Sequence, residues 1–392
     1  MPAVLRVRDF RLLWTARLVS ALGSWLLVLA VPVHVYVLSG GSVLLTGAAL
    51  AAEFLPPVLL GPVAGVLVDR WDRRRAMVAA DLLRAAAVAV LLLVRDPGDL
   101  WLVYVALLVE STGTVLFRPA AQAHTPVVVG TGPPLGEANA LNSFADGAAR
   151  LVGAPLGGAL VVVVGFPALV VVDAVSYLVS AGLVARTSAA VGRGDRAGVR
   201  GVLGELAEGV RFLRSERTAL ALLAATSVFL AANASLSVLL VPFGMAELGG
   251  PGPIGVVMAG LGVGFLLGVP STRRLVGRVR TGPLLVVALA LTASGFALLF
   301  TSASWVAAAP AAVLVGWAGS TVLVVSQTAV QRVTPAGLLG RIGAALFTGE
   351  AVATLAGSLA GPALAELTSV RVAAFVACGV ALLAAVPAAA AR

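Results

Sequence analysis

Charged residues are scarce in this chain of 392 residues: they make up 11% of it, and lysine is absent. Soluble domains contain about 25% charged residues, so the scarcity excludes an ordinary soluble protein. Hydrophobic residues make up 60% of the sequence, and the mean hydropathy is +1.04. Because a membrane-spanning helix needs about 20 apolar residues, this composition predicts an integral membrane protein.

Cysteine and histidine are almost absent as well. The single cysteine, Cys378, excludes an intrachain disulfide and a cysteine metal cluster. The two histidines, His34 and His124, lie in different segments, which gives little support to a metal site or to histidine-based catalysis. The sequence has no P-loop, so ATP does not drive the protein directly. We therefore expect no enzyme activity, no metal and no cofactor.

The net charge of +9 comes from arginines that cluster between alternate apolar runs. Most of these arginines fall on one side of the expected spans. The exceptions are Arg95 and Arg371 on the other side, and Arg17, Arg84 and Arg150 within the runs. The positive-inside rule makes the arginine-rich side cytoplasmic, together with both termini. The basic residues therefore predict contact with anionic lipid headgroups and not with nucleic acid.

Twelve apolar runs are expected as membrane-spanning helices. They cover residues 10–38, 43–68, 76–94, 100–117, 138–164, 168–184, 218–243, 255–268, 283–300, 305–330, 342–365 and 372–389. Segment 118–137 is expected to return through the cytoplasm, and 199–214 to form an amphipathic helix on the inner membrane surface. The predicted domains are an N-terminal six-helix bundle (1–185), a linker (186–216) and a C-terminal six-helix bundle (217–392).

The two halves repeat a pattern of polar and small residues. A Gln-x-x-Thr-Pro turn occurs at 122–126 and again at 331–335. At a constant offset in sequence, the first half has Asp146, Gly153 and Gly157, and the second half has Glu350, Gly357 and Gly361. A repeat of six helices, related by a pseudo-twofold axis, is what a two-bundle transporter needs, because its substrate site lies between the repeats.

A charged turn separates the second and third expected spans. The apolar run ends at Asp69, and arginines follow at positions 70, 73, 74 and 75. Gly61 and Gly65, four residues apart, permit a neighbouring helix to approach closely. Asp72 is expected either to cap the next helix or to pair within the turn.

Residues 65–77 resemble the signature that joins the second and third helices of the major facilitator superfamily, with Asp72 where a glycine is usual. Further similarity lies in Phe10-Arg-Leu-Leu-Trp14, Ser20-Ala-Leu-Gly23, Phe117-Arg-Pro-Ala120, Ala138-Asn-Ala-Leu-Asn-Ser143 and Arg211-Phe-Leu-Arg214. These stretches resemble bacterial efflux members, in the enterobactin-exporter and macrolide-efflux-like branch. The resemblance implies alternating access, export from the cytoplasm and proton antiport across the bacterial plasma membrane. We expect a monomer.

The resemblance also implies roles for particular residues. A conformational switch would consist of Gly61, Gly65, Asp69, Arg70, Arg73 and Arg74. In it, Asp69 would lock the cytoplasmic side against the start of the eleventh helix. The stretch Gly153-Ala-Pro155-Leu-Gly157-Gly158 resembles the antiporter motif of the fifth helix, with the proline moved by one position. Ser24 stands where related sequences often have an acid, and the arginine that drug–proton antiporters have in the fourth helix is absent.

Acidic residues inside a membrane cost roughly 2.5–3.5 kcal/mol each on insertion scales, so they are functional candidates. Glu110 is expected to carry protons or to bind a cationic substrate. Asp146 is expected either to carry protons or to pair with Arg150 one turn later. Glu350 either carries protons or pairs with the charged turn. Glu53, beside a double proline, is the fourth candidate for proton coupling; Asp173 is expected on a peripheral helix.

Four polar residues are candidates for the substrate cavity: Arg17, His34, Asn233 and Gln327. Each is also open to a purely structural interpretation, as is Arg84, which is expected either to pair with Asp81 or to snorkel to the membrane surface. The predicted function is export of a small amphipathic organic molecule, of the drug, antibiotic or siderophore type. The alternatives are a proton-coupled uptake permease and a non-transporting membrane sensor or assembly subunit.

Overall fold

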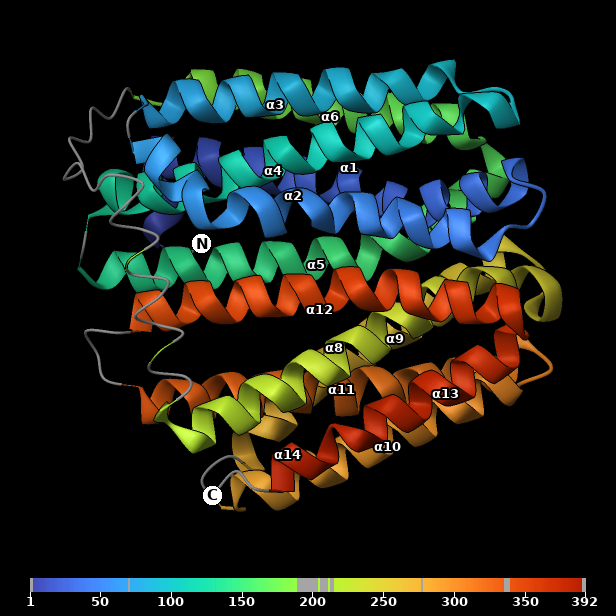
Figure 1. The fold of residues 1–392 in the computed structure, drawn as a ribbon. Helices are drawn as coiled ribbons and strands as arrows, with labels where there is room; N and C mark the ends of the chain where they lie inside the picture. The colour runs from blue at the N-terminus through green and yellow to red at the C-terminus, as the bar shows by residue number, and fades with distance from the viewer. Residues whose placement is uncertain are drawn as a thin grey trace. The chain divides into compact units, whose positions relative to one another are not determined.

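A computed structural model of the protein describes residues 3–69, 71–130, 132–188, 204, 211, 215–275, 278–334 and 339–389. For residues 62, 63, 65–69, 155, 273, 331, 339–341 and 343–345 the description covers the backbone alone. Most of the predicted linker and its amphipathic helix lie outside the described residues, as does Arg70. The described chain is built from helices (Figure 1).

The helices follow the apolar runs of the sequence. In the first half they are α1 (Arg8–Leu38), α2 (Val43–Asp69), α3 (Arg73–Val90), α4 (Leu100–Val129), α5 (Pro133–Val163) and α6 (Phe166–Ala185), with the short turns η1 (Ala3–Arg6), η2 (Leu91–Leu93) and η3 (Pro97–Asp99). In the second half they are α8 (Arg217–Phe243), the π-helical turn η4 (Gly244–Leu248), α9 (Pro251–Leu275), α10 (Thr281–Thr301), α11 (Trp305–Val333), α12 (Leu339–Leu367), α13 (Val370–Leu383) and α14 (Ala385–Ala389).

Eleven segments of the described chain are long and apolar enough to cross a membrane. The helix α12 has 29 residues, which is also sufficient length for a span. The predicted all-α membrane architecture is therefore confirmed.

Most of segment 118–137, for which the sequence predicts a return through the cytoplasm, is helical. The helix α4 continues through Pro119 and Pro126 to Val129, and α5 begins at Pro133. A proline removes one backbone hydrogen bond, which a helix packed among others in a membrane tolerates, and proline at the start of α5 removes only an N–H that has no partner within the helix. Arg118 is consequently a residue of α4.

By packing, the chain divides into two compact units. The first comprises Met1–His34 and Leu55–Val202, and the second comprises Val35–Phe54 and Leu203–Arg392. The start of α2 thus packs in the second unit, where Glu366 Oε1 accepts hydrogen bonds from Ser42 Oγ (3.1 Å) and from the backbone N–H of Val43 (2.9 Å) and Leu44 (3.2 Å). The bundle boundaries drawn from the sequence remain a prediction.

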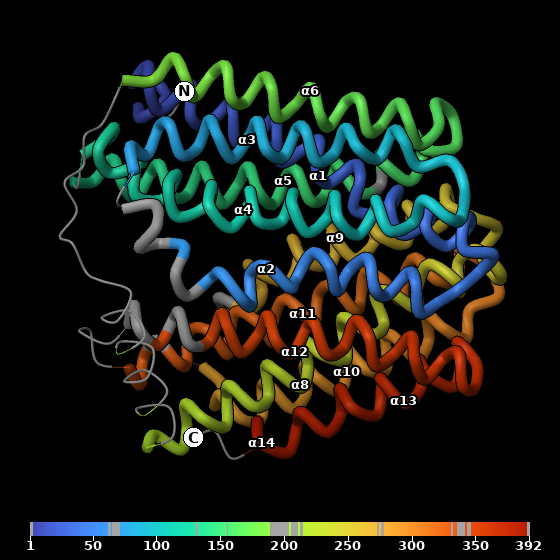
Figure 2. The backbone as a smooth tube through the Cα atoms, turned by 45° about the horizontal axis from the view of Figure 1, so that its top comes forward, coloured from blue at the N-terminus to red at the C-terminus, as the bar shows by residue number. Residues whose placement is uncertain are grey.

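Within the first unit, α3 packs against both α4 and α6, and the backbone trace shows the three helices running beside one another (Figure 2). Met77, Phe117 and Val184 are among the buried apolar residues that join them. This packing encloses the middle of α3, where the sequence has Asp81 and Arg84.

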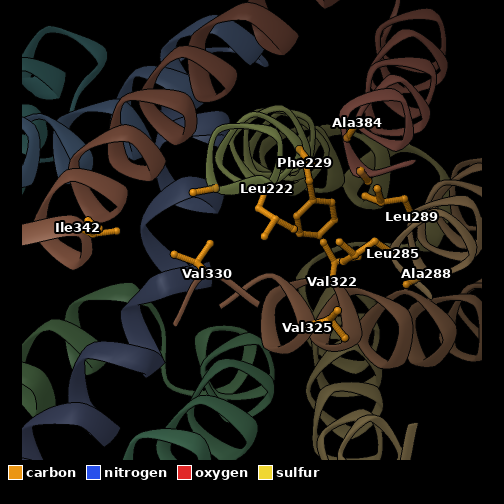
Figure 3. Packing of buried hydrophobic residues seen from close by; sticks show 13 residues of the cluster. Leu222, Phe229, Leu285, Ala288, Leu289, Val322, Val325, Val330, Ile342 and Ala384 are labelled. Atoms are coloured by element: carbon orange, nitrogen blue, oxygen red, sulfur yellow. The ribbon is translucent and has the colours of Figure 1, made fainter. Parts of the chain in front are cut away.

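The core of the second unit is apolar. Side chains of α8, α10 and α11 meet there, with Leu222, Phe229, Leu285, Leu289 and Val322 as examples (Figure 3). By contrast, the aspartate and arginine side chains that are buried among the described residues all lie in the first unit: Asp81, Arg84 and Asp173. The first unit is therefore where a charged site is to be sought.

Candidate functional site

A charged cluster lies between α1, α3, α4 and α6 of the first unit. Its members are Ser24 on α1, Asp81 and Arg84 on α3, Glu110 and Thr114 on α4, and Asp173, Tyr177 and Ser180 on α6. We refer to these residues as the charged cluster.

Arg84 is the cation of this cluster, and its side chain contacts residues of α3, α4 and α6. It pairs with Asp81, as the spacing of three residues predicted. Its guanidinium carbon lies 4.5 Å from the ring centroid of Phe117 and 4.4 Å from that of Tyr177, within the range of cation–π attraction. Gly113 makes room for it, because a Cβ at that position would lie 2.6 Å from Arg84 Cγ. Arg84 is thus a fixed positive charge.

Asp81 is the fixed negative charge beside it. Its carboxylate accepts a hydrogen bond from Ser180 Oγ at 2.7 Å in addition to its pairing with Arg84. The two side chains carry opposite charges and are in direct contact, although Arg84 Nε is buried without a hydrogen-bond partner among the described residues. Asp81 and Arg84 therefore neutralise each other.

Glu110 is the half-buried carboxyl of the cluster. Its Oε1 accepts hydrogen bonds from Thr114 Oγ1 at 2.9 Å and from Tyr177 OH at 2.7 Å. Tyr177 OH is also 2.7 Å from Ser24 Oγ, so that a line of hydroxyl groups continues to α1. The donors that reach Glu110 are therefore neutral hydroxyls, which leave its charge without direct compensation.

Asp173 is the third carboxyl and is only 1% exposed. Ser176 Oγ lies 3.2 Å from its Oδ1, and Gly23 of α1 packs directly on both, since a Cβ there would lie 2.5 Å from that oxygen. Asp173 interacts electrostatically with Glu110 and Arg84. Three carboxyls thus lie around the guanidinium of Arg84, in a medium that disfavours uncompensated charge.

Arg17 and Asp146, predicted separately, form an ion pair between α1 and α5. Arg17 Nη2 lies 2.5 Å from Asp146 Oδ2, and Arg17 Nε donates to Oδ1 at 3.0 Å. This two-pronged contact is the strongest form of a carboxylate–arginine pair. The spacing in the sequence suggested Arg150 as a partner of Asp146. In the structure, the guanidinium carbon of Arg150 lies over the ring of Trp25, 5.2 Å from its centroid.

The predicted antiporter motif forms a close contact between α5 and α1. A Cβ at Gly153 would lie 2.4 Å from Trp25 Cβ, and one at Gly157 would lie 2.2 Å from the carbonyl oxygen of Leu26. The following residue, Gly158, is buried. Only small residues permit two helix backbones to approach this closely.

The second unit repeats this contact with the matching glycines. A Cβ at Gly357 of α12 would lie 2.0 Å from the carbonyl oxygen of Ala231 on α8, and one at Gly361 would lie 2.6 Å from Ser235 Cβ. Ser235 Oγ also donates to the Gly357 carbonyl at 2.7 Å. The glycines that repeat in the sequence therefore occupy equivalent helix contacts in the two units.

The charged turn is anchored within the first unit. Asp72 caps α3 by accepting a hydrogen bond from Arg75 N at 2.9 Å, which is one of the two roles expected for it. Arg73 Nη1 donates to the carbonyl of Ala123 on α4, and Arg74 Nη1 donates to that of Thr187 after α6, both at 3.0 Å. Gly61, Gly65 and Asp69 lie in the last turns of α2. The lock proposed for Asp69 remains a prediction.

The other candidate residues lie apart from the charged cluster. His34 stacks on Phe166 with ring centroids 3.9 Å apart, which is a packing role near the end of α1. Glu53, Asn233 and Glu350 are half-buried in the second unit, and Gln327 is exposed there. Among the described side chains, Glu350 has no ion-pair partner.

Tyr177 and the depth of Asp173 were missed from the sequence. Asp173, Ser176, Tyr177 and Ser180 recur at positions i, i+3, i+4 and i+7, which places them on one face of α6. A polar stripe inside an otherwise apolar span marks a face turned toward other helices. This periodicity was the available signal.

The fold and the site define a multi-span membrane protein with buried ionisable groups and a close helix contact that is repeated in its two units. More particularly, residues 2–391 match the family model described as transmembrane secretion effector, and the chain belongs to this family of the major facilitator superfamily.

Several relatives are efflux proteins by name. Macrolide efflux protein A of Streptococcus pyogenes is 38% identical over 122 residues, which cover 31% of this chain and 30% of that protein. Macrolide efflux protein A of Enterococcus faecalis is 46% identical over 78 residues, 19% of this chain and 24% of that one. The matched stretches thus span less than a third of the length of these two relatives.

Solved structures share the fold over nearly the whole chain. The nucleoside transporter NupG superimposes with a TM-score of 0.78 at 11% identity, covering 98% of this chain and 98% of the other. A POT family transporter in complex with a thioalcohol-conjugated peptide gives a TM-score of 0.75 at 10% identity, covering 97% and 95%. These likenesses show that the chain has the major facilitator fold.

Proposed function

We propose that this transporter exports a small amphipathic organic molecule of the drug, antibiotic or siderophore type from the cytoplasm in exchange for protons, by alternating access. It works as a monomer in the bacterial plasma membrane, surrounded by lipid, with both termini in the cytoplasm. The direction is supported by the relatives named macrolide efflux protein A. A macrolide is therefore the first compound to try.

The observation that carries proton coupling is the position of Glu110. It is half-buried, whereas the other two carboxyls of the charged cluster are fully buried. Its hydrogen bonds come from hydroxyl groups, while Asp81 holds the guanidinium of Arg84. A carboxyl with partial access and no direct counter-ion is suited to gaining and losing a proton in a membrane.

The other proton-coupling candidates serve as comparisons. Asp146 is occupied by its ion pair with Arg17, which favours a structural role. Glu350, without an ion-pair partner among the described side chains, is the rival to Glu110. Glu53 lies beside Pro56 and Pro57 on α2, in the part of that helix that packs with the second unit.

Inverted membrane vesicles test the proposal. With an acidic lumen and a pH-sensitive dye, a macrolide added outside should cause proton release that depends on the protein. Glu110→Gln should abolish this release but retain exchange of labelled for unlabelled substrate, because exchange moves no net protons. Glu350→Gln is the matched comparison.

Three outcomes would contradict the proposal. Substrate movement without a proton signal would remove the coupling, and loss of release in Glu350→Gln alone would move the site to α12. Substrate leaving the lumen together with protons would identify an uptake permease instead of an exporter.

A further inference from the structure

A line of hydroxyl groups joins Glu110 to the backbone of α1. Tyr177 OH lies 2.7 Å from Glu110 Oε1 and 2.7 Å from Ser24 Oγ, and Ser24 Oγ lies 2.9 Å from the carbonyl oxygen of Ser20. These are ordinary hydrogen-bond lengths between oxygen atoms. The line crosses from α4 through α6 to α1.

The line has three contacts, but its two hydroxyl groups have only two hydrogens. An ionised carboxylate is an acceptor only, so with ionised Glu110 one contact has no hydrogen. Thr114 does not supply it, because its hydroxyl donates to Glu110 itself. A proton on Glu110 is the missing hydrogen: Glu110 then donates to Tyr177, Tyr177 to Ser24, and Ser24 to the Ser20 carbonyl.

We propose that Glu110, Tyr177 and Ser24 form a hydrogen-bond chain that is complete only when Glu110 carries a proton, so that α1 responds to the protonation of α4. This inference rests on the proposed role of Glu110 in proton antiport. When Glu110 releases its proton, Tyr177 turns its hydrogen to the carboxylate, and Ser24 can turn to Tyr177. A serine that bonds the carbonyl four residues before it tends to bend its helix, so this switch acts on α1 itself.

The switched part of α1 is closely packed against α5 and α6. Gly23 lies against Asp173 of α6, and the next residues, Trp25 and Leu26, lie against the motif glycines of α5. A small change in the bend of α1 at Ser24 therefore acts directly on the α1–α5 contact. The residues of α1 that contact the antiporter motif, Trp25 and Leu26, therefore follow Ser24 directly in the sequence.

Other charges also act on Glu110 and are kept unchanged in the test. They are Arg84 on α3, Arg118 on the same helix and Asp173 on α6. On α1 the facing group is the hydroxyl of Ser24, through Tyr177.

The experiment is an infrared titration of the protonated carboxyl band of Glu110 in purified full-length protein in lipid vesicles. The band is identified by its loss in Glu110→Gln. The test variants are Tyr177→Phe and Ser24→Ala. Ser20→Ala is the matched control, because among the described residues the Ser20 hydroxyl donates to the Arg17 carbonyl of its own helix, at 3.3 Å, and the Ser20 carbonyl remains in the variant.

Both test variants should shift the titration midpoint. Tyr177→Phe removes the hydroxyl that contacts the Glu110 carboxyl, so the midpoint should shift by about one pH unit or more. Ser24→Ala removes the group on α1 that Tyr177 contacts, so the midpoint should shift by about half a unit or more. Ser20→Ala should match the wild type.

Equal midpoints in Ser24→Ala and Ser20→Ala would overturn the chain. A Glu110 band that does not titrate would overturn it as well. The proposed function fails separately, if the wild type moves substrate without protons in vesicles. The titration needs no substrate, so the two failures are distinguishable.

Discussion

Adding a single methyl group at Gly157 should separate α1 from α5. The new Cβ of Gly157→Ala would lie 2.2 Å from the Leu26 carbonyl oxygen, a backbone atom that no rotamer change can move. To reach ordinary contact the helices must move apart by roughly 1 Å, and overpacking of this kind costs about 1–3 kcal/mol. The same helix provides the control: a Cβ at Gly147 would meet nothing within 4 Å.

The comparison of Gly157→Ala with Gly147→Ala isolates the steric cost. Both variants exchange glycine for alanine in α5, so both gain the same helix propensity, up to about 1 kcal/mol, and it cancels in the difference. At roughly 2–4 °C per kcal/mol for a unit of this size, Gly157→Ala should melt about 2–12 °C below Gly147→Ala. The measurement is thermal unfolding of purified protein in detergent, followed by intrinsic fluorescence.

The transport rate provides the second readout of the same pair. Gly147→Ala should transport as the wild type does, whereas Gly157→Ala should be impaired because α1 and α5 no longer fit. Equal melting temperatures for the two variants would refute the close contact, and would remove the structural basis for the role of α1 argued above.

Three further predictions concern charged groups. Asp81→Asn and Arg84→Gln should each cost about 3–5 kcal/mol, because each leaves a buried charge unpaired, while the double variant should recover part of this in thermal unfolding; additive losses would contradict the pair. Exchanging Arg17 and Asp146 should restore vesicle transport that either single charge reversal reduces, because the exchange keeps the two opposite charges together, and absence of rescue would contradict the ion pair. Asp69→Asn should weaken the cytoplasmic lock and increase labelling of cysteines introduced on the cytoplasmic side, without loss of protein from the membrane; unchanged labelling and transport would refute the lock.

The helices could be predicted from the sequence because each span is a long apolar run, and such runs leave few alternatives. The exception was α4, where Arg118, Pro119 and Pro126 gave the pattern of a loop. A membrane helix tolerates proline when neighbouring helices support it, and that support cannot be seen in a local pattern. Asp72 was a similar case, since capping and pairing were both possible until its backbone position was known.

The charged cluster could be predicted only in part. Glu110 and the pair of Asp81 with Arg84 follow from acids and spacing within single helices. The contact of Arg17 with Asp146 joins residues far apart in the chain, and the local spacing favoured Arg150 instead. Tyr177 carried no charge to draw attention, although it links three helices of the cluster.

The serine at position 24 follows from the geometry of this cluster. Related sequences often have an acid there, and Ser24 Oγ is 2.7 Å from the Tyr177 hydroxyl that also binds Glu110. A carboxyl at that position would add a fourth acid beside the single guanidinium of Arg84, at the cost of a further uncompensated charge in the membrane. The Tyr177 hydroxyl contacts both position 24 and position 110. A carboxyl at either position can therefore accept a hydrogen bond from this hydroxyl. Ser24→Asp should therefore restore substrate-dependent proton release in vesicles to Glu110→Gln, whereas Ser20→Asp, one turn away on the same helix, should not. Release that stays absent in the Ser24→Asp double variant, with the protein present in the membrane, would show that the two positions are not equivalent.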